Sequence, residues 1–352
     1  MMPPTVLAPA HELAGRKLAS GWKVIEKVER PATATGGMFS VGYRVEDERG
    51  HRAYLKALDY SSVMRLPNVA VLLQRMTESY NFERRVLDEC GRRGMSRVVR
   101  VLAADTVVDE SFSHAVDYLI FEEAEGDVRD ALDAMQDFDT TWALTLCHHA
   151  AVAVQQMHGI GLAHQDVKPS NLLTFADWLA KLGDLGRSSK RGTAAPHDSE
   201  AVRGDPVYAP PELLYGQLDP DWSVRCQACD VYLLGSLILF IFTRTQTTGE
   251  IVRRLPLPVR PGPFCEPYPL VLPYIENAFD EVADAFEAQL QGERAVELAH
   301  HFRALCHPDP AKRGDPVQRR RGLNPFNVQR LISRLDVLVY EARAGYLTKG
   351  TP

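Results

Sequence analysis

Five polar side chains of the kinds that carry out chemistry occur within one short stretch of the chain. Between Gly161 and Gly186, in a largely apolar setting, stand His164, Asp166, Lys168, Asn171 and Asp184. A carboxylate can accept or orient a proton, and carboxylate and amide oxygens are the hard ligands that Mg²⁺ prefers. A surface turn would explain Asp166 alone, but it does not explain the whole set. The stretch therefore predicts a polar reaction site that other parts of the chain must position.

The composition limits the kind of protein that carries this site. The chain has 352 residues, of which 45% are hydrophobic and 24% charged, as is usual for a globular protein of about two domains. The formal net charge of −6 gives no electrostatic reason to expect nucleic acid or an anionic membrane as a partner. The N-terminal residues lack the basic start and the long apolar core of a secretory signal.

The cysteines and the longest apolar run indicate a cytoplasmic protein. Six cysteines are scattered without the spacing of a disulfide framework, which favours a reducing compartment. Cys226 and Cys229 form a C-x-x-C, but no second pair follows, so two packed thiols are a better interpretation than a zinc or redox site. The run Val231–Phe242 has 12 residues, whereas a membrane span needs about 20. We interpret it as a central buried helix.

The first third of the chain has the pattern of an antiparallel sheet with one main helix. Residues 22–58 alternate in the manner of three strands, with a turn signal at Glu48–Gly50. A helical stretch follows over Val69–Gly91. Two further strand candidates cover Val98–Val108 and His114–Glu123.

Beyond Glu123 the pattern is mainly helical. Thr140–His158 carries its apolar residues near one helix face. Seven prolines over Pro256–Pro273 predict an extended connection. A P-x-x-P within it could dock an aromatic groove of a partner, but a stiff loop over a helical domain is the simpler interpretation. Asn324 followed by Pro325 predicts the start of a final amphipathic helix.

Two motifs in this chain resemble those of a known family. The stretch from His164 to Asn171 reads H-Q-D-V-K-P-S-N and resembles the catalytic loop of the protein kinases, H-R-D-x-K-P-x-N. The sequence Asp184–Gly186 resembles their D-F-G motif and follows Asp166 by 18 residues. Two motifs in the family's order are much stronger evidence for the family than either motif alone. The chain is therefore similar to the eukaryotic-like (Hanks-type) serine/threonine protein kinases, as found in bacteria.

This resemblance implies an α+β, bilobal protein-kinase fold. A small antiparallel β-sheet N-lobe with one main helix would bind the nucleotide. A larger, mostly helical C-lobe would carry the catalytic loop, the activation segment and a C-terminal helix. The expected boundaries are a flexible tail at 1–20, the N-lobe at 21–122, the C-lobe at 123–345 and a second tail at 346–352.

The resemblance also implies roles for the polar residues of the two motifs. Asp166 would accept or orient the proton of the attacking hydroxyl, and Lys168 would balance charge on the γ-phosphate of ATP. Asn171 and Asp184 are expected to hold Mg²⁺, for which Mn²⁺ can substitute. The metal would bridge the phosphates of the bound ATP.

The sequence Ala53–Lys56 resembles the V-A-I-K stretch of the same family. The resemblance places Lys56 on the third strand, in contact with the α- and β-phosphates, and puts Ala53 in the nucleotide site. Glu83 is the expected helix partner of Lys56, and apolar residues surround it at helical spacing. Glu78 is the alternative partner, because the apolar pattern alone does not fix the helix register.

The family's glycine-rich loop, G-x-G-x-x-G-x-V, is only partly matched. Gly36 and Gly37 form a pair between two strands, and such a pair lets the backbone approach phosphates closely. By itself it would be a plain β-turn, and its support comes from the strands around it and from Lys56. Gly42 stands at the valine position of the pattern, where the family covers adenine.

The sequence L-I-F-E-E-A, which ends at Ala124, resembles the fifth strand and the hinge of a protein kinase. Phe121 would be the gatekeeper. Backbone groups from Glu122 to Ala124 are expected to meet the adenine edge, and Leu173 would lie beneath the ring. Apolar residues in a strand are otherwise ordinary core, so the resemblance alone supports these roles.

Three later matches concern the scaffold. A-P-P-E, which ends at Glu212, resembles the A-P-E end of the activation segment. Asp230 opens D-V-Y-L-L-G, which resembles the start of the central C-lobe helix, and would accept hydrogen bonds from the catalytic-loop backbone. Arg313 matches the late arginine that pairs with the glutamate of A-P-E.

Two departures from the family pattern bear on regulation. Gln165 replaces the arginine that normally receives the activation-loop phosphate, so we expect activity that does not need loop phosphorylation. The loop still offers hydroxyls for autophosphorylation: Ser188, Ser189, Thr193 and Ser199. Asp205 stands where a threonine is usual, and it either pairs with the nearby lysine or raises the pKa of a neighbouring acid.

Three functions are compatible with these motifs. The first is a Mg-ATP-dependent serine/threonine protein kinase, whose partners are ATP and protein substrates rather than nucleic acid or a membrane. Lys168 and Pro169 favour Ser/Thr over Tyr acceptors. The second is a pseudokinase that acts as a nucleotide-binding or protein-interaction module. The third, a small-molecule kinase, would lack the A-P-E segment and its arginine partner.

Overall fold

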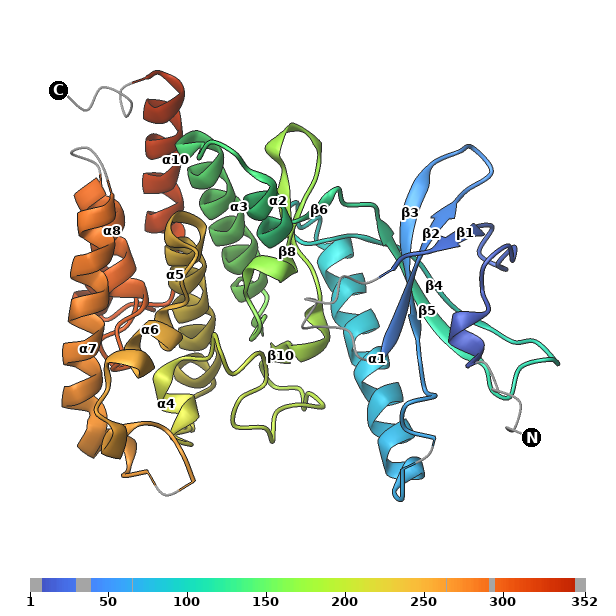
Figure 1. Ribbon diagram of the computed structural model, residues 1–352, viewed down its shortest axis with the longest axis horizontal. Helices are drawn as coiled ribbons and strands as arrows, with labels where there is room; N and C mark the ends of the chain where they lie inside the picture. The colour runs from blue at the N-terminus through green and yellow to red at the C-terminus, as the bar shows by residue number, and fades with distance from the viewer. Residues whose placement is uncertain (1–7, 30–38, 65, 264, 291–294, 346–352) are drawn as a thin grey trace. The chain divides into compact units, whose positions relative to one another are not determined.

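The computed structural model forms two compact units joined by short connections. It describes residues 8–29, 39–64, 66–263, 265–290 and 295–345. The first unit comprises Met1–Gly94 and Val99–Ala124, and the second comprises Met95–Val98 and Glu125–Pro352. In Figure 1 the first unit is drawn in blue to teal and the second in green to red.

The first unit is built on an antiparallel sheet, as the sequence predicts. Within the described residues this sheet has five strands in the order β1-β2-β3-β5-β4. They are β1 (Lys23–Lys27), β2 (Ser40–Glu46), β3 (Arg52–Leu58), β4 (Val101–Val107) and β5 (Val116–Glu122). Side chains alternate between the faces of a strand, and in β3 the residues Ala53, Leu55 and Ala57 are fully buried in one core cluster. Tyr54 and Lys56 therefore lie on the opposite face.

A long helix, α1 (Val69–Arg92), accompanies the sheet in the same unit (Figure 1). Its buried residues recur at helical spacing: Tyr80, Phe82, Glu83, Val86, Leu87 and Cys90. Five of them have apolar or aromatic side chains or a thiol, and the sixth is a glutamate. A carboxylate in a helix face of this kind needs a cationic or hydrogen-bonding partner to offset its loss of hydration.

The described part of the expected N-terminal tail packs against the sheet. Ala10 and Leu13 are fully buried in the cluster that contains Tyr43 of β2. The Tyr43 hydroxyl donates a hydrogen bond of 2.8 Å to the carbonyl oxygen of Ala10. Residues 8–20 are therefore part of the first unit rather than a flexible tail, because apolar side chains in this segment complete its core. Residues 1–7 and 346–352, the outer parts of the two expected tails, lie outside the described residues.

The second unit is mostly helical, as the sequence predicts. Its helices are α2 (Val128–Ala134), α3 (Thr140–His158), α4 (Pro211–Leu214), α5 (Ala228–Thr243), α6 (Thr247–Arg254), α7 (Tyr268–Gln289), α8 (Ala295–Leu305), α9 (Pro316–Arg320) and α10 (Gln329–Arg343). Short strands lie between them: β6 (Gly126–Asp127), β7 (Leu162–Ala163), β8 (Leu172–Thr174), β9 (Ala180–Leu182) and β10 (Ser189–Lys190). The strands β6, β8 and β9 form one small antiparallel sheet, and β7 pairs with β10.

Helix α5 is the centre of the second unit. Every residue from Ala228 to Ile241 is buried. Together with the π-helical turn Ser223–Gln227 it makes a 21-residue helix that is apolar enough to cross a membrane by length and composition alone. However, 89% of that apolar window is buried inside the protein, which is the usual situation of a core helix. The apolar run predicted to be a central buried helix is one.

Two expected boundaries in the second unit are wrong. The proline-rich span is not extended throughout, because α7 begins at Tyr268 and contains Pro273. Pro269 stands in the first turn of α7, where the missing N–H of a proline has no helical acceptor to lose, whereas Pro273 lies inside the helix and omits one helical hydrogen bond. The final helix starts at Gln329 rather than after Asn324, whose side chain instead accepts from the backbone N–H of Phe326. The carbonyl of Pro325 accepts from the backbone of Asp315, which holds this segment as a turn.

Candidate active site

The catalytic-loop motif of the second unit is held by a buried aspartate of α5. Asp230 is fully buried, and its Oδ2 accepts hydrogen bonds of 2.7 Å from the backbone N–H of His164 and 2.9 Å from the His158 ring. Its Oδ1 accepts from the backbone N–H of Gln165 at 2.7 Å. Hydrogen bonds to a carboxylate are about twice as strong as neutral ones. They hold Gln165 in a left-handed conformation with φ of 67°, which a residue other than glycine adopts only under constraint.

His164 connects the two motifs that the sequence predicts to act together. It is fully buried, and its Nε2 lies 2.9 Å from the carbonyl oxygen of Gly183, which directly precedes Asp184. A carbonyl can only accept, so Nε2 carries the proton. The Nδ1 atom then accepts from the backbone N–H of Asp166 at 3.2 Å. A single neutral imidazole thus fixes the distance between Asp166 and the backbone next to Asp184.

Asp166, Lys168 and Asn171 meet in one buried polar cluster. The Lys168 Nζ lies 3.0 Å from Asp166 Oδ2, and Asn171 Nδ2 donates to the same oxygen at 3.0 Å. Asn171 Nδ2 also donates to the carbonyl oxygen of Asp166 at 2.8 Å. Each of the three residues is 6% exposed, so their charges and dipoles interact with little screening by water. The structure brings together the three residues that the sequence predicts to be catalytic.

Burial raises the pKa of Asp166 above its usual value. The ion pair with Lys168 opposes this effect, whereas the nearby negative charge of Asp184 adds to it. A carboxylate with a raised pKa is a better proton acceptor than an ordinary aspartate, provided that it is ionised. The environment therefore makes the ionised Asp166 carboxylate a stronger base than an ordinary aspartate.

The structure decides between the two alternatives for Asp205. Its Oδ2 lies 3.7 Å from Lys168 Nζ, so it pairs with the lysine. Its backbone N–H donates to Asp166 Oδ1 at 2.9 Å, and this hydrogen bond lowers the pKa of Asp166 rather than raising it. Lys168 is thus shared between two carboxylates.

Gly204 allows this close approach of the activation segment to the catalytic loop. A Cβ atom at Gly204 would overlap the carbonyl oxygen of Gln165 and lie 2.6 Å from Asp166 Oδ1. Neither atom can move away cheaply, because one is backbone and the other belongs to the buried cluster. No sequence pattern pointed to Gly204 beyond its place beside Asp205.

We expect Gly204→Ala to lower kcat by about 100-fold, because displacing a reacting group by about 1 Å costs a factor of that order. The backbone conformation of Gly204 lies outside the left-handed region, so strain in φ does not contribute. Steady-state kinetics would check the prediction. Gly126→Ala is a suitable control, because a Cβ atom at Gly126 would have open space around it. Gly216→Ala is not suitable, because Gly216 has a φ of 71° that strains an alanine. Equal kcat values for Gly204→Ala and Gly126→Ala would contradict the prediction.

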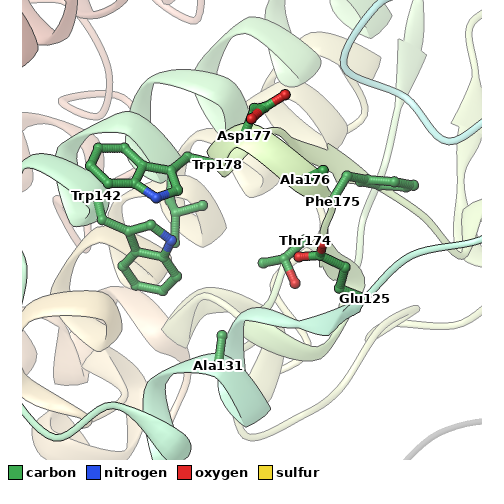
Figure 2. A pocket seen from close by; sticks show the side chains of 9 residues that line it. Glu125, Ala131, Trp142, Thr174, Phe175, Ala176, Asp177 and Trp178 are labelled. Atoms are coloured by element: carbon green, nitrogen blue, oxygen red, sulfur yellow. The ribbon is translucent and has the colours of Figure 1, made fainter.

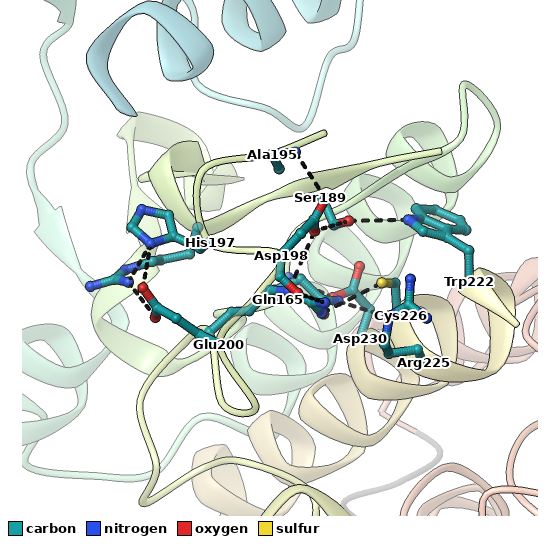
Figure 3. Close-up of polar contacts among 12 residues, drawn as sticks. Gln165, Ser189, Ala195, His197, Asp198, Glu200, Trp222, Arg225, Cys226 and Asp230 are labelled. Carbon is teal, nitrogen blue, oxygen red and sulfur yellow. Dashed lines mark hydrogen bonds and ion pairs between the residues drawn. The ribbon is translucent and has the colours of Figure 1, made fainter. Parts of the chain in front are cut away.

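Gln165 takes part in a network that ties down the activation segment (Figure 3). Its Oε1 accepts from Arg203 at 2.8 Å, and its Nε2 donates to the carbonyl oxygen of Cys226 at 2.8 Å. Arg203 is 4% exposed and lies 3.5 Å from Asp198 Oδ1. Asp198 in turn accepts from the Ser189 hydroxyl at 2.8 Å. A carboxylate of the segment, that of Asp198, therefore lies beside Arg203.

This network supports activity that is independent of loop phosphorylation. Ser188 and Ser189 are fully buried, whereas Thr193 and Ser199 are exposed and remain accessible as autophosphorylation sites. We expect phosphatase treatment to leave the rate of substrate phosphorylation unchanged, and Arg203→Met to lower it because the segment loses its anchor. Radiolabel transfer before and after treatment measures the first effect. Loss of activity on dephosphorylation would show that a phosphate completes the site.

The donor set predicted for a metal is Asn171 and Asp184. The backbone N–H of Gly183 donates to the carbonyl oxygen of Asn171 at 2.9 Å, which brings Asp184 next to Asn171. Both donations by Asn171 Nδ2 go to Asp166, so the amide oxygen is directed away from that carboxylate. An amide and a carboxylate oxygen fit Mg²⁺, which binds through one or two carboxylates and completes its shell with phosphates and water. Among the described residues, no group of three or more His, Cys, Asp and Glu side chains is arranged to hold a metal by itself.

In the first unit, Lys56 pairs with Glu83 of α1. The Lys56 Nζ donates to the two carboxylate oxygens at 3.1 and 3.2 Å. The Glu83 side chain is 7% exposed and that of Lys56 22% exposed, so the amine is the more accessible partner. Glu78 instead accepts from Gln74 on the helix surface. The partner of Lys56 is thus Glu83 rather than Glu78.

The other nucleotide contacts predicted for the first unit involve Ala53, Glu122, Ala124, Gly36 and Gly37. Ala53 is fully buried in the core cluster on the face of β3 opposite to Lys56, so its assignment to the nucleotide site is not supported. The strand alternates, and Tyr54 shares the face of Lys56 instead. Glu122 is the last residue of β5, and its backbone N–H donates a hydrogen bond to the carbonyl oxygen of Arg100. Ala124 is the last residue of the first unit. Gly36 and Gly37 lie outside the described residues.

Glu212 and Arg313 form the predicted scaffold ion pair in the second unit. The Nη1 and Nη2 atoms of Arg313 donate hydrogen bonds of 2.6 and 2.8 Å to the two carboxylate oxygens of Glu212. Arg313 is fully buried and Glu212 is 5% exposed. Burial by itself lowers the pKa of Arg313, but the carboxylate of Glu212 more than offsets this and the pKa is raised. The pair joins the end of the activation segment to the helical core.

Comparison with known proteins agrees with these motifs. The family model described as "Protein kinase domain" matches residues 63–252, which is more than half of the chain. The match includes the catalytic-loop cluster, Asp184 and Glu212. The chain belongs to the protein kinase family. Its resemblance to the Hanks-type serine/threonine kinases and the fold class drawn from it are thereby confirmed. Lys56 lies before the matched residues.

The curated relatives of this kinase are serine/threonine-protein kinases. The chain is 28% identical over 149 residues to "Serine/threonine-protein kinase CHK1" of Saccharomyces cerevisiae, which covers 41% of this chain and 27% of that protein. It is 28% identical over 171 residues to "Probable serine/threonine-protein kinase CE0033" of Corynebacterium efficiens, covering 47% and 26% respectively. A plant relative, "Serine/threonine-protein kinase RUNKEL" of Arabidopsis thaliana, is 32% identical over 98 residues, or 28% of this chain and 7% of that one. The chain thus spans little more than a quarter of these relatives, or less.

A hollow in the second unit of the kinase is separate from the residues assigned above (Figure 2). It lies at the turn between β8 and β9, where Trp142, Trp178 and Phe175 contribute aromatic side chains and Glu125 a carboxylate. Leu173, the predicted floor of the adenine site, belongs to β8 but does not line this hollow. The predicted site and this hollow are therefore different places.

The proline-rich and C-x-x-C segments of the kinase are used for packing. In the P-x-x-P stretch, the Val259 carbonyl accepts from the Tyr215 hydroxyl, and Arg260 donates to the carbonyls of Leu255 and Arg253. Cys226 and Cys229 are free, buried thiols whose pKa burial raises. Both observations support the simpler interpretations.

Sequence reasoning missed two structural features of this kinase. Arg203 was not singled out, because no local pattern distinguishes this buried arginine from a surface one. The close contact between Gly42 and the Tyr54 ring was also missed. Both residues differ from the family pattern, and the sequence shows that. That they meet becomes clear only from the strand register, in which Gly42 pairs with Lys56 and Arg44 with Tyr54.

Proposed function

We propose that this kinase transfers the γ-phosphoryl group of Mg-ATP to serine and threonine hydroxyls of proteins, its own chain included. The observation that carries the proposal is the buried cluster of Asp166, Lys168 and Asn171, tied through His164 to the backbone beside Asp184. Structural needs alone do not explain why two polar side chains, those of Lys168 and Asn171, share the one buried carboxylate of Asp166.

The proposed step needs positioning and charge neutralisation more than covalent chemistry. The acceptor hydroxyl oxygen forms a bond to the γ-phosphorus while the bond to the β–γ bridging oxygen breaks and ADP leaves. Asp166 orients the hydroxyl and takes up its proton, for which the raised pKa suits it. Lys168 balances negative charge on the transferring group. A lysine two residues after the aspartate, as in the serine/threonine kinases that the chain resembles, supports Ser/Thr as acceptors.

The chain's own residues account for nucleotide binding in the proposal. Asn171 and Asp184 would hold Mg²⁺, or Mn²⁺ in its place, and the metal would supply positive charge to the phosphates. Lys56, positioned by Glu83, would contact the α- and β-phosphates. Backbone groups of Gly36 and Gly37 would approach them.

The base and the cellular setting complete the proposal. Backbone groups from Glu122 to Ala124 would meet the base, and Leu173 would contact its face. The free thiols agree with a reducing, cytoplasmic setting, because buried cysteines without disulfides are usual there. The partners expected on this basis are ATP and protein substrates.

A pseudokinase is the second candidate, and the pairing of Lys168 with Asp205 favours it. A second carboxylate on this lysine reduces the positive charge available to the γ-phosphate. Against it stands the full set of Lys56, Asp166, Asn171 and Asp184. Wild-type protein incubated with γ-labelled ATP, Mg²⁺ and a generic basic protein, beside Asp166→Ala and Asp184→Asn, separates the two. Label transferred by wild type alone supports the kinase, and nucleotide binding without transfer supports the pseudokinase.

A further inference from the structure

The hollow at the turn between β8 and β9 is lined by three aromatic rings that do not stack on one another (Figure 2). They belong to Trp142, Trp178 and Phe175, and among the described residues none of the three contacts another aromatic ring. The volume of the hollow is about 270 Å³, which suits one long side chain or a small molecule. Lys181 Nζ already lies 5.0 Å from the ring centre of Phe175. The two tryptophan rings therefore have faces available to a ligand.

Trp142 contributes a hydrogen-bond donor that has no acceptor. The residue is 8% exposed, and a buried indole N–H usually finds a partner. Among the residues that the structure describes, the Nε1–H of Trp142 has none, whereas that of Trp222 donates to the Ser189 hydroxyl at 3.1 Å. The Trp142 nitrogen is not sealed inside the protein, so it opens into the hollow that its ring lines. A ligand with a hydrogen-bond acceptor would satisfy this donor.

Glu125 brings a negative charge to the same hollow. Its backbone N–H donates to the carbonyl oxygen of Thr174 at 2.8 Å, and β6 pairs with β8 directly after it. These contacts fix Glu125 beside the turn. In the part of the chain that the structure describes, no cationic side chain pairs with its carboxylate. Figure 2 shows the Asp177 carboxylate pointing away from Glu125, so Glu125 is the acidic group that a ligand would meet.

The turn holds Trp178 at the hollow against its backbone preference. Asp177 and Trp178 are consecutive residues with φ of 58° and 61°. A left-handed conformation costs a residue that has a side chain about 1–2 kcal/mol. The backbone N–H of Phe175 donates to the carbonyl oxygen of Leu179 at 2.8 Å, which closes the turn. Trp178 is 42% exposed, so packing inside the protein does not explain its placement, and such strain is typical of ligand sites.

An arginine of a protein chain has the chemistry that these groups bind. The faces of tryptophan rings attract cations, and a guanidinium is planar, weakly hydrated and able to stack on them. It also forms paired hydrogen bonds with a carboxylate such as that of Glu125. A lysine ammonium is more strongly hydrated and loses more on entering an aromatic site. A guanidinium cannot accept from the Trp142 N–H, but a peptide carbonyl beside it can.

We propose that this hollow binds the guanidinium group of an arginine in a protein partner. The guanidinium lies against the Trp178 ring and pairs with Glu125, while a backbone carbonyl of the partner accepts from the Trp142 N–H. The site goes beyond phosphoryl transfer and does not depend on it. None of the described residues assigned to that reaction is among those that line the hollow.

Binding of a blocked arginine, N-acetyl-arginine N-methylamide, to the full chain tests the proposal. The citrulline analogue has the same shape without the charge, and ethylguanidinium has the charged group without the peptide groups. The chain has four tryptophans, so their indole N–H signals in a ¹⁵N NMR spectrum report on each ring. We expect the blocked arginine to shift the signals of Trp142 and Trp178 and to leave those of Trp22 and Trp222 in place. Ethylguanidinium should bind about fivefold more weakly, as loss of one hydrogen bond predicts, and the citrulline analogue should cause no shift.

Two variants test the ligand-binding groups separately. Glu125→Gln keeps the shape of the side chain and removes its charge, whereas Trp178→Ala removes the stacking face. We expect each to weaken binding of the blocked arginine about two- to fivefold, the usual effect of losing one exposed ion pair or one cation–π contact. Glu266→Gln and Tyr340→Ala, which change exposed residues elsewhere in the second unit, are the matched controls. Circular dichroism confirms that each variant is folded.

Three results would overturn the proposal. Equal binding of the blocked arginine and its citrulline analogue would show that charge plays no part. Equal affinities of Glu125→Gln and Glu266→Gln would remove Glu125 from the site. Equal shifts of all four indole signals would show that the ligand does not select the hollow. Equal binding of ethylguanidinium and the blocked arginine would overturn the assignment to a protein partner, because the peptide carbonyl would then make no contact.

Discussion

Replacing Asp166 with asparagine is expected to lower kcat for protein phosphorylation by about 10²–10⁴-fold, the usual contribution of a general base. Asparagine has the same shape but cannot take up the proton of the acceptor hydroxyl. The cluster also loses its negative charge, so Asp205 becomes the remaining carboxylate paired with Lys168 among the residues that the structure describes. ATP affinity should change little, because Asp166 acts on the acceptor hydroxyl. Transfer of label to a protein substrate and calorimetric ATP binding measure the two quantities.

The wild-type pH profile gives an independent check on the same residue. The folded protein raises the pKa of Asp166, chiefly through burial, so its protonated form persists to higher pH than in an ordinary aspartate. Only the ionised form can accept a proton. Activity should therefore fall as pH decreases through the raised pKa, and this acid limb should lie above the usual aspartate range.

Asp177→Asn is the matched control for Asp166→Asn. Asp177 is exposed in the turn between β8 and β9, with φ of 58°, a conformation that asparagine also adopts readily. We expect it to leave kcat and the acid limb unchanged. Wild-type kcat in Asp166→Asn would remove Asp166 from the chemistry and leave the cluster without a base.

The second large effect concerns stability rather than chemistry. Arg313→Met should lower the free energy of unfolding by about 3–5 kcal/mol, because it leaves the Glu212 carboxylate buried and unpaired. The substitution also removes hydrogen bonds from Arg313 to the carbonyls of His307, Ala228 and Pro308. The guanidinium further loses its position 5.0 Å from the ring centre of Tyr232. Urea unfolding followed by circular dichroism measures the change.

Two further variants separate the charge from the packing. Glu212→Leu/Arg313→Met removes both charges, and it should be more stable than Arg313→Met because no unpaired carboxylate remains. Lys312→Met, which breaks the exposed pair with Glu276 in the same unit, should leave the unfolding midpoint unchanged. If Arg313→Met unfolds like wild type, the buried pair contributes nothing to the stability of the second unit.

Local patterns made much of this kinase predictable. The catalytic loop and the D-L-G sequence are short, and their chemistry depends on residue types at fixed spacing, which a sequence displays directly. The helix predicted over Val69–Gly91 is found at Val69–Arg92, one residue longer. The prediction was accurate because the apolar spacing is regular. The apolar run of α5 indicated a buried helix for the same reason.

Contacts between distant segments decided the rest. The Arg203–Gln165 hydrogen bond joins residues 38 positions apart, and no local pattern distinguishes Arg203 from a surface arginine. The placement of Ala53 in the core depended on which face of β3 the rest of the first unit covers. Helix α10 starts late because Asp315 binds the backbone of Pro325.

The sequence by itself determined which residues can do the chemistry, because their types and spacing are local properties. Only the tertiary structure decided how those residues are held and what lies beside them. It showed Lys168 shared by two carboxylates, Gly204 closing on Asp166, and Tyr54 lying on Gly42. Each of these depends on the distance between chain segments that packing brings together, and such distances are fixed by the fold as a whole.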